Sequence, residues 1–380
     1  MKIVVLVCEG MADEPLKELA GRTPLEVAKT PNMNLLAKQG SLAQGSFIPS
    51  ALRPSGDVAA MSILGFDPQE FYTGIAPLEA LAMRIQQTDR TIAFRCNLVS
   101  VLDGGLVDPT SGNISLTESR ILINALNEKL SNNRIKFFAG KGFRNLLMVD
   151  DAELSESLDD LDCAPPQAVV GQKILKNFPK GQGASSIIDL INASKEILEN
   201  HEINKVRIDL QENPANMIWP WGQGKKPKIP AFKQRYNLEG SLVSGAVCIQ
   251  GLGKALELER VDTLEAAIDK KDFIFVYHAL TESQKIDLMS KIRALEEFDA
   301  SVVGPVWKKL QNSKHRLCIT ADTLWPIAKK MPVHGLVPIL FEGNGVDPDG
   351  AALFNEKNTL ESRRIFNEGH KMMEYFLKLK

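Results

Sequence analysis

Three polar residues follow short apolar runs of the sequence and could do chemistry together. They are Glu9, His278 and Asp322, and His334 stands just ahead of a further apolar run. Ligands of open α/β sheets bind outside the carboxyl ends of the strands, so we expect these side chains to share one crevice. Carboxylates and imidazoles in one crevice suit a divalent metal that handles phosphate. Each residue alone has a plainer explanation, as a helix cap, a turn residue or a hydrogen-bonded edge histidine.

The turn from Pro54 to Asp57 is a second candidate site. A Pro-Ser-Gly-Asp turn that enters a helix offers free backbone N–H groups and the positive end of the helix dipole, which together can hold a phosphate. Ser55 could act as a nucleophile, although the sequence places no base beside it. The alternative is that Asp57 simply caps the helix.

The elements that must position these residues are short buried strands that alternate with helices. Apolar runs at 3–7, 273–277 and 337–341 are each followed by a helical pattern, and such alternation indicates an α/β fold with a mostly parallel sheet covered on both faces. One helix is predicted after Thr30, which can cap it, and ends at Gly40. A longer helix carries apolar residues three or four apart over 286–306.

The middle of the chain lacks this alternation. Residues 113–170 combine a helical stretch with two apolar runs, and we expect a small α+β domain inserted there. The core domain would then be discontinuous and consist of residues 1–112 and 171–380. The segment 219–230 is rich in Pro, Gly and Lys and is interpreted as a long ordered loop.

Composition excludes several classes of protein. The 380 residues include 45 Lys and Arg against 47 Asp and Glu, so the net charge gives no reason to expect nucleic acid or an anionic membrane as partner. No apolar run is long enough to span a bilayer. The five cysteines are far apart and form no C-x-x-C pair, which suits reduced thiols and predicts a cytoplasmic protein.

Several motif strings are spaced along nearly the whole chain. They are Gly10-Met11-Ala12-Asp13, Gly21-Arg22-Thr23-Pro24-Leu25-Glu26, Met61-Ser62-Ile63-Leu64-Gly65-Phe66-Asp67-Pro68, Tyr72-Thr73-Gly74, Phe94-Arg95-Cys96-Asn97, Trp221-Gly222-Gln223-Gly224-Lys225-Lys226-Pro227 and Gly369-His370-Lys371-Met372-Met373. Together they resemble the archaeal-type 2,3-bisphosphoglycerate-independent phosphoglycerate mutases of the alkaline phosphatase superfamily. The resemblance implies an alkaline-phosphatase-like sheet with helices on both faces. It also implies glycolytic interconversion of 3- and 2-phosphoglycerate by a serine nucleophile and two manganese or zinc ions.

The site departs from the family pattern at several positions. The aspartate after the first strand is Glu9, and Gly56 stands where the family has its nucleophilic serine. His278 is kept, but the Asp-x-x-x-His run that the family has after it is missing, and Asp322 is followed by Thr323 instead of histidine. Glu9, Asp322 and His334 therefore remain as weak remnants of the metal site, and we expect no tightly bound ion.

Four basic residues could still form an anion pocket. Arg95, Arg144 and Lys225 match the family's pattern, and Arg53 is placed beside the former nucleophile turn. Arginine binds carboxylate and phosphate well, so substrate binding could outlast catalysis. Structural ion pairs are an equally good explanation for these side chains.

Three functions follow from the resemblance. The first is a catalytically inactive mutase-like protein, a pseudoenzyme, that binds a small phosphorylated metabolite or a protein partner, as a homo- or hetero-oligomer. The second is an active phosphotransferase, either a mutase or an enzyme similar to the homoserine-kinase-like branch of the family, which would use Ser55 and a reduced metal site. The third is a purely structural subunit that pairs with an intact homologue. Gly56 fits only the first and the third, because either a lost nucleophile or lost metals would remove most of the rate.

Overall fold

A computed structural model describes residues 1–379 of the chain, which form two compact units. Unit 1 comprises Met1–Tyr72 and the chain from Lys228 onward, and unit 2 comprises Thr73–Pro227. Unit 2 includes the predicted insertion at 113–170 but is wider at both ends. The reason is that its central strand and its last strand, which are far apart in sequence, pair with each other.

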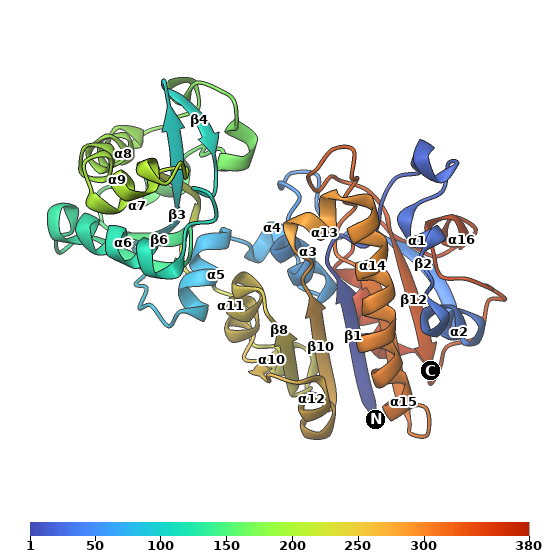
Figure 1. The fold of residues 1–380 in the computed structure, drawn as a ribbon. Helices are drawn as coiled ribbons and strands as arrows, with labels where there is room; N and C mark the ends of the chain where they lie inside the picture. The colour runs from blue at the N-terminus through green and yellow to red at the C-terminus, as the bar shows by residue number, and fades with distance from the viewer. Residues whose placement is uncertain (380) are drawn as a thin grey trace. The chain divides into compact units, whose positions relative to one another are not determined.

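Unit 1 is built around a mixed sheet of eight strands, and Figure 1 shows part of this sheet beside the helix α14 (Leu288–Phe298). The spatial order is β13 (Ile365–Phe366), β2 (Ser41–Gly45), β12 (Val337–Gly343), β11 (His315–Ala321), β1 (Lys2–Cys8), β10 (Phe273–His278), β8 (Gly240–Ser244) and β9 (Glu259–Arg260). The five strands from β11 to β9 are parallel, and β12 runs antiparallel to both its neighbours. The mostly parallel sheet expected from the sequence is confirmed.

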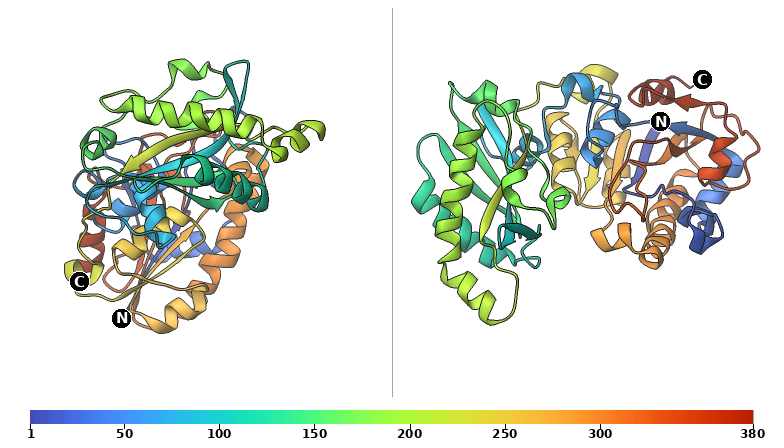
Figure 2. Two further views of the ribbon diagram at one scale, coloured as in Figure 1. Left: turned by 90° about the vertical axis from the view of Figure 1, so that its left-hand side faces the viewer. Right: turned by 90° about the horizontal axis from the view of Figure 1, so that it is seen from above.

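Helices cover both faces of this sheet, as expected for parallel strands that are apolar on both sides. Seen from above, the orange helix α14 and the red helix α17 lie on opposite sides of the strands (Figure 2, right). The helices of unit 1 are α1 (Pro24–Val27), α2 (Pro31–Gln39), α3 (Gly56–Ile63), α4 (Pro68–Phe71), α10 (Phe232–Tyr236), α11 (Val247–Ala255), α12 (Leu264–Lys270), α13 (Glu282–Ile286), α14 (Leu288–Phe298), α15 (Gly304–Leu310), α16 (Glu356–Leu360) and α17 (Lys371–Lys378), with a 3-10 turn η1 (Lys17–Leu19) and a π-helical segment η4 (Asp299–Val303).

The two helices predicted from the sequence are present, with one change at a cap. Helix α2 begins after Thr30, but the Thr30 side chain makes no capping hydrogen bond. The carboxylate of Asp299 accepts the N–H groups of Asn32 at 3.1 Å and Met33 at 2.7 Å instead. A distant residue therefore satisfies the helix start, which no local pattern could show. The predicted longer helix corresponds to α14, η4 and α15 in succession.

Unit 2 is an antiparallel sheet covered by helices. The strands are β4 (Gly105–Asp108), β3 (Thr91–Leu102), β6 (Arg144–Asp150) and β5 (Ile135–Lys141) in spatial order, with β7 (Met217–Gly224) paired to the other side of β3. Its helices are α5 (Ile75–Ala82), α6 (Leu116–Leu130), α7 (Ser155–Asp159), α8 (Ala184–Glu199) and α9 (Glu202–Asp209), with 3-10 turns η2 (Pro166–Val169) and η3 (Ile174–Lys176). The interpretation of 219–230 as a loop is wrong up to residue 224, because β7 extends through it.

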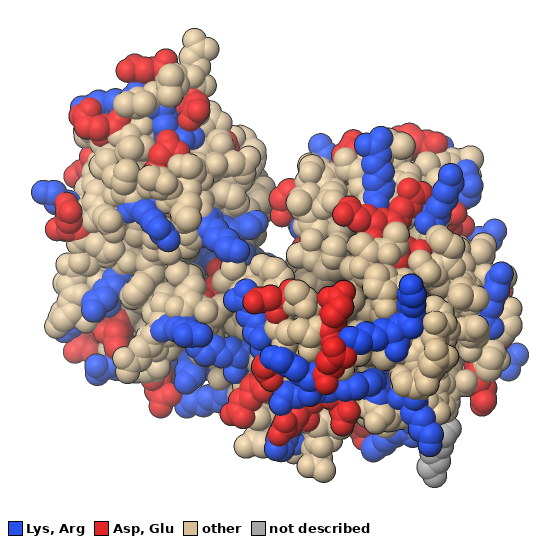
Figure 3. Space-filling model, turned by 60° about the horizontal axis from the view of Figure 1, so that its bottom comes forward, with Lys and Arg blue, Asp and Glu red and all other residues tan. Residues whose placement is uncertain are grey.

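The surface carries both signs of charge. On the face shown in Figure 3, Lys and Arg side chains are interspersed with Asp and Glu, in keeping with the net charge of −2. Among the helices of residues 1–379, none is both long and apolar enough to cross a membrane.

Candidate functional site

The site of unit 1 lies where β1 and β11 end. These strands are parallel neighbours, with Cys8 opposite Ala321, so Glu9 and Asp322 follow their carboxyl ends side by side. The backbone N–H of Gly10 donates a hydrogen bond of 2.8 Å to Asp322 Oδ1, and the N–H of Thr323 donates one of 2.6 Å to the same oxygen. The structure thus brings Glu9 and Asp322, two of the residues expected in one crevice, to the same edge of the sheet.

Tyr277, and not His278, is the β10 residue that reaches Asp322. Its hydroxyl donates a hydrogen bond of 2.8 Å to Asp322 Oδ2, and both side chains are buried. Successive side chains of a strand point to opposite faces, so His278 points away from the site. Its ring lies 5.5 Å from that of Phe298 on α14. The prediction that His278 joins Glu9 and Asp322 is therefore wrong.

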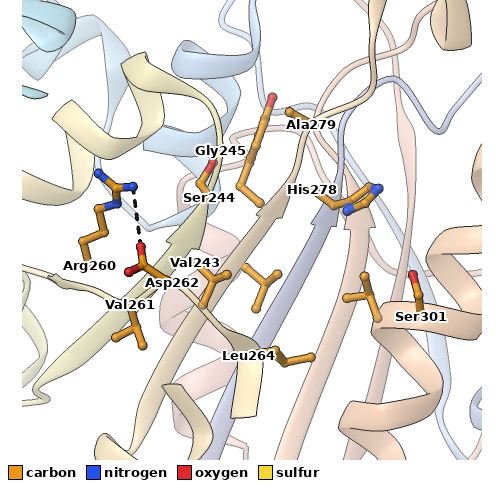
Figure 4. A pocket seen from close by; sticks show the side chains of 13 residues that line it. Val243, Ser244, Gly245, Arg260, Val261, Asp262, Leu264, His278, Ala279 and Ser301 are labelled. Atoms are coloured by element: carbon orange, nitrogen blue, oxygen red, sulfur yellow. Dashed lines mark ion pairs between the residues drawn. The ribbon is translucent and has the colours of Figure 1, made fainter. Parts of the chain in front are cut away.

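His278 lines a separate groove on the other face of the sheet. This cavity has a volume of about 420 Å³ and lies over β8 and β10. Figure 4 shows the imidazole directed toward the helical segment that carries Ser301, while Arg260 and Asp262 form an ion pair of 3.6 Å at the other side of the view. Neither Glu9 nor Asp322 lines the groove, although Tyr277 is among its lining residues.

Gly56 is enclosed by the same buried pair. It is the first residue of α3, and a Cβ atom at this position would lie 2.2 Å from Tyr277 Oη and 2.9 Å from Asp322 Oδ2. Real Cβ atoms do not approach oxygen so closely, and close packing leaves no slack for them. The phenol of Tyr277 thus fills the space that the side chain of a serine at position 56 would need.

The neighbours of Gly56 behave differently from the expectation for a capped helix. Ser55 is the N-cap residue of α3 and has extended backbone angles, but its side chain makes no capping hydrogen bond. Asp57 does not cap α3 either, because its carboxylate accepts the hydroxyl of Tyr72 at 2.6 Å. The first N–H groups of α3 therefore receive no side-chain cap from this turn.

A lysine ammonium lies against Glu9. Lys285 of α13 donates a hydrogen bond of 2.8 Å to Glu9 Oε1 and one of 3.3 Å to Glu282 Oε1. Its side chain is only 4% exposed, and its ammonium lies 4.1 Å from the centre of the Trp325 ring. A cation of the protein itself therefore holds this corner of the site.

Burial and charge shift the pKa values of this cluster. Burial raises the pKa of Glu9 to about 7, although Lys285 works against the rise. Burial likewise raises the pKa of Asp322, opposed by its hydrogen bonds from Gly10 and Tyr277. Burial and then the charge of Asp322 hold the pKa of Tyr277 well above its usual value, so this phenol keeps its proton.

A second buried ion pair lies nearby. Lys291 of α14 donates to Asp13 Oδ2 at 2.7 Å, and neither side chain is exposed to solvent. Asp13 N–H donates to Glu356 at 3.0 Å, and the hydroxyl of Thr23 donates to the other oxygen of Glu356 at 2.6 Å. Burial raises the pKa of Glu356 to about 7.

His334 does not complete a metal site. Its Nε2 lies 3.0 Å from the carbonyl oxygen of Leu52 and 3.3 Å from that of Pro49, and the residue is exposed. Within the described part of the chain, no three His, Cys, Asp or Glu side chains are grouped so that they could hold a metal ion. Glu9, Asp322 and His334, the remnants named from the sequence, are not brought together as ligands.

Two manganese or zinc ions, which the resemblance implies, do not fit these residues. A site for such an ion needs several ligand atoms free to converge on it. Here one oxygen of Glu9 is bound by Lys285, and both oxygens of Asp322 accept protein hydrogen bonds. These carboxylate oxygens, which would have to bind the ions, are thus already bound by other groups of the protein.

The predicted anion-binding residues are divided between the units. In unit 2, Arg95 donates to Glu79 at 2.8 Å through Nε, with a second contact between the two groups, and lies over the ring of Trp221. Lys225 donates to Glu156 at 2.7 Å. For these two residues, the ion pairs in the structure favour the structural explanation.

The other two predicted anion-binding residues are more accessible. The Arg144 guanidinium lies 4.8 Å from the centre of the Phe143 ring, and Arg144 is exposed. Arg53 of unit 1 is exposed and precedes the turn that starts α3. Arg53 is therefore the predicted cation that stands beside the candidate site of unit 1.

Sequence reasoning missed Tyr277 and Lys285. Strand alternation could have signalled Tyr277, since residues 273–278 have two faces and only one of them faces α3. Lys285 had a weaker signal, namely a basic residue close to the positions where the resemblance implies acidic and histidine ligands that this sequence lacks.

Comparisons with known proteins agree with the resemblance. A sequence model of the family described as 2,3-bisphosphoglycerate-independent phosphoglycerate mutase matches residues 37–204. The chain is 35% identical over 397 residues to 2,3-bisphosphoglycerate-independent phosphoglycerate mutase 2 of Methanothermobacter thermautotrophicus, a match that covers 99% of this chain and 97% of the relative. It is 32% identical to a probable enzyme of the same name from Geobacter sulfurreducens, covering 99% of this chain and 100% of that protein.

Solved structures show the same fold. A protein from Pyrococcus horikoshii has a TM-score of 0.81 at 23% identity and covers 100% of this chain and 97% of its own. The cofactor-independent phosphoglycerate mutase of Thermoplasma acidophilum has a TM-score of 0.64 at 26% identity, with 100% of both chains covered. The full-length matches above 30% identity establish that this chain belongs to the 2,3-bisphosphoglycerate-independent phosphoglycerate mutase family.

Proposed function

We propose that this chain is a non-catalytic member of its family that binds a small phosphorylated carboxylic acid without transferring its phosphoryl group. The observation that carries the proposal is the contact of Gly56 with Tyr277 and Asp322. A nucleophile at position 56 needs a side chain, and the phenol of Tyr277 takes up the space for one. The same phenol uses an oxygen of Asp322.

The charge arrangement supports the same proposal. In-line phosphoryl transfer depends on cations that neutralise charge at the attacking and leaving oxygens. The ammonium of Lys285 is committed to Glu9 and Glu282 and is almost fully buried, so it is poorly placed to meet a substrate. Without nucleophile and metals, the largest contributions to the rate are missing.

Binding is supported by the start of α3. Helix α3 has eight residues, and neither Ser55 nor Asp57 caps its first N–H groups. A helix N-terminus attracts anions, and Arg53 adds a guanidinium at the same turn. A phosphate group would meet both features, and this is the ligand chemistry that we propose for unit 1.

Activity and metal content test the loss of catalysis. We expect the purified protein to contain well under one manganese or zinc ion per chain, and to show no turnover in a coupled mutase assay with added manganese. Turnover that Ser55→Ala abolishes would overturn the proposal in favour of an active phosphotransferase. Two stoichiometric metal ions would overturn it as well.

Thermal unfolding with 3-phosphoglycerate tests the binding part. We expect the ligand to raise the melting temperature of the wild type and to lose this effect in Arg53→Gln, because bound ligand stabilises the folded state by mass action. The matched control is Arg293→Gln, which removes an exposed arginine of α14. An equal ligand effect in wild type and Arg53→Gln would refute binding at the start of α3.

A further inference from the structure

Unit 1 contains a buried ammonium, that of Lys285, near the carboxyl ends of β1 and β11, which are followed by Glu9 and Asp322. The Lys285 ammonium contacts Glu9 at 2.8 Å and Glu282 at 3.3 Å. Carboxylate oxygens around a small cation are also the ligands that hard divalent ions prefer. Here the cation belongs to a side chain of the protein.

Gly10 and Trp325 pack around the Lys285 side chain. Gly10 has a φ of +64°, and a Cβ at this position would lie 3.3 Å from both Cγ and Cδ of Lys285. Trp325 covers the ammonium from another side at 4.1 Å. The aliphatic stem and the charged end of Lys285 are therefore both enclosed.

The buried carboxylates favour a cation at this point. Glu9 and Asp322 are both largely buried, and two neighbouring carboxylates in a buried place repel each other unless one takes up a proton or a positive charge lies beside them. Within residues 1–379, Lys285 is the cation that forms an ion pair with Glu9. Lys285 thus supplies at Glu9 the positive charge that a metal ion could otherwise supply.

We propose that Lys285 is a built-in counter-ion that makes this site independent of metal, and that removing its ammonium opens a divalent-cation site on Glu9, with Glu282 as a further carboxylate. The inference concerns the same site as the proposed function. It does not depend on whether the protein binds a phosphorylated acid, and its test measures cation binding instead of turnover.

The experiment compares the response of wild type and Lys285→Ala to Mn²⁺. We expect wild type to show no change in melting temperature with Mn²⁺ or with a chelator. Lys285→Ala should melt lower than wild type, and Mn²⁺ should recover part of the loss. Paramagnetic resonance of free Mn²⁺ should show about one ion bound per Lys285→Ala chain, with weak affinity because water supplies the remaining ligands.

Two further variants keep the test decisive. Adding Glu9→Gln to Lys285→Ala should abolish the Mn²⁺ response, which ties the ion to Glu9. Lys329→Ala removes a lysine that pairs with Glu14 at 2.7 Å on the surface, and should change neither stability nor Mn²⁺ binding.

Clear results would overturn the inference. One is wild-type protein that binds Mn²⁺ as well as Lys285→Ala does; another is folded Lys285→Ala that binds none. If Lys285→Ala does not fold without metal, we expect Mn²⁺ in the refolding buffer to restore its circular dichroism spectrum. Failure of Mn²⁺ to do so would refute the inference equally.

Discussion

The contact between Gly56 and Tyr277 can be measured with a double-mutant cycle. Gly56→Ala adds a single methyl group whose carbon would lie 2.2 Å from Tyr277 Oη, about 1 Å inside normal contact. Both Tyr277 and its partner Asp322 are buried and cannot move freely. Overpacking of this kind lowers the free energy of unfolding by about 1–3 kcal/mol. The higher helix propensity of alanine raises it by at most about 1 kcal/mol.

Removing the phenolic oxygen should remove most of that cost. In Tyr277→Phe the nearest ring atom would be the former Cζ, which lies 3.4 Å from the added Cβ, an ordinary contact. The 2.9 Å approach to Asp322 Oδ2 remains. We therefore expect Gly56→Ala to cost about 1–2 kcal/mol in the wild-type background and about half as much or less in the Tyr277→Phe background.

Urea unfolding followed by circular dichroism gives the four stabilities of the cycle. Tyr277→Phe alone should lower stability by about 1.5–3 kcal/mol, since it removes a hydrogen bond to a carboxylate. The control is Gly245→Ala, a glycine with open space around its Cβ position and no positive φ, which should stay within about 0.5 kcal/mol of wild type. Equal costs of Gly56→Ala in both backgrounds, or a cost no larger than that of Gly245→Ala, would refute the steric argument.

Three further predictions concern the buried charges. The pKa of Glu356 is raised to about 7 in the folded state, so the folded protein holds an extra proton between about pH 4.5 and 7. The free energy of unfolding therefore falls by up to about 3 kcal/mol as the pH rises through that window. Glu356→Gln should flatten this part of a plot of melting temperature against pH. Lys291→Met leaves Asp13 buried without its cation and should cost about 3–5 kcal/mol in urea unfolding, part of which Asp13→Asn should restore. Arg95→Gln should cost about 3 kcal/mol in the same assay, and adding Glu79→Gln should recover much of it; a cost near zero would mean that Arg95 is not held by its ion pair.

Much of the framework around the site could be predicted from local patterns. The apolar runs of β1, β10 and β12 are continuous, and a run apolar on both faces has few places to go except a covered parallel sheet. That sheet brings Glu9 and Asp322 to one edge, as expected. The extent of unit 2 could not be predicted in the same way, because the pairing of β3 with β7 joins residues more than a hundred positions apart.

The sequence by itself determined the family, the class of sheet and the absence of a side chain at position 56. These are properties of residue identity and local periodicity, which need no knowledge of contacts. Only the tertiary structure decided what surrounds that glycine. Whether Tyr277 or His278 faces Asp322 depends on a single step along a strand, and that step follows from the register of β10 beside β1.

The tertiary structure also decided the charge balance of the site. Lys285 lies 276 positions from Glu9 in sequence, and its ammonium reaches that carboxylate only because α13 follows β10 at the same edge of the sheet. Long-range electrostatic pairing of this kind leaves no periodic trace in the chain. The departures from the ligand pattern that the resemblance implies were therefore visible in the sequence, whereas the contacts of Lys285 with Glu9 and of Tyr277 with Asp322 became visible only in the folded protein.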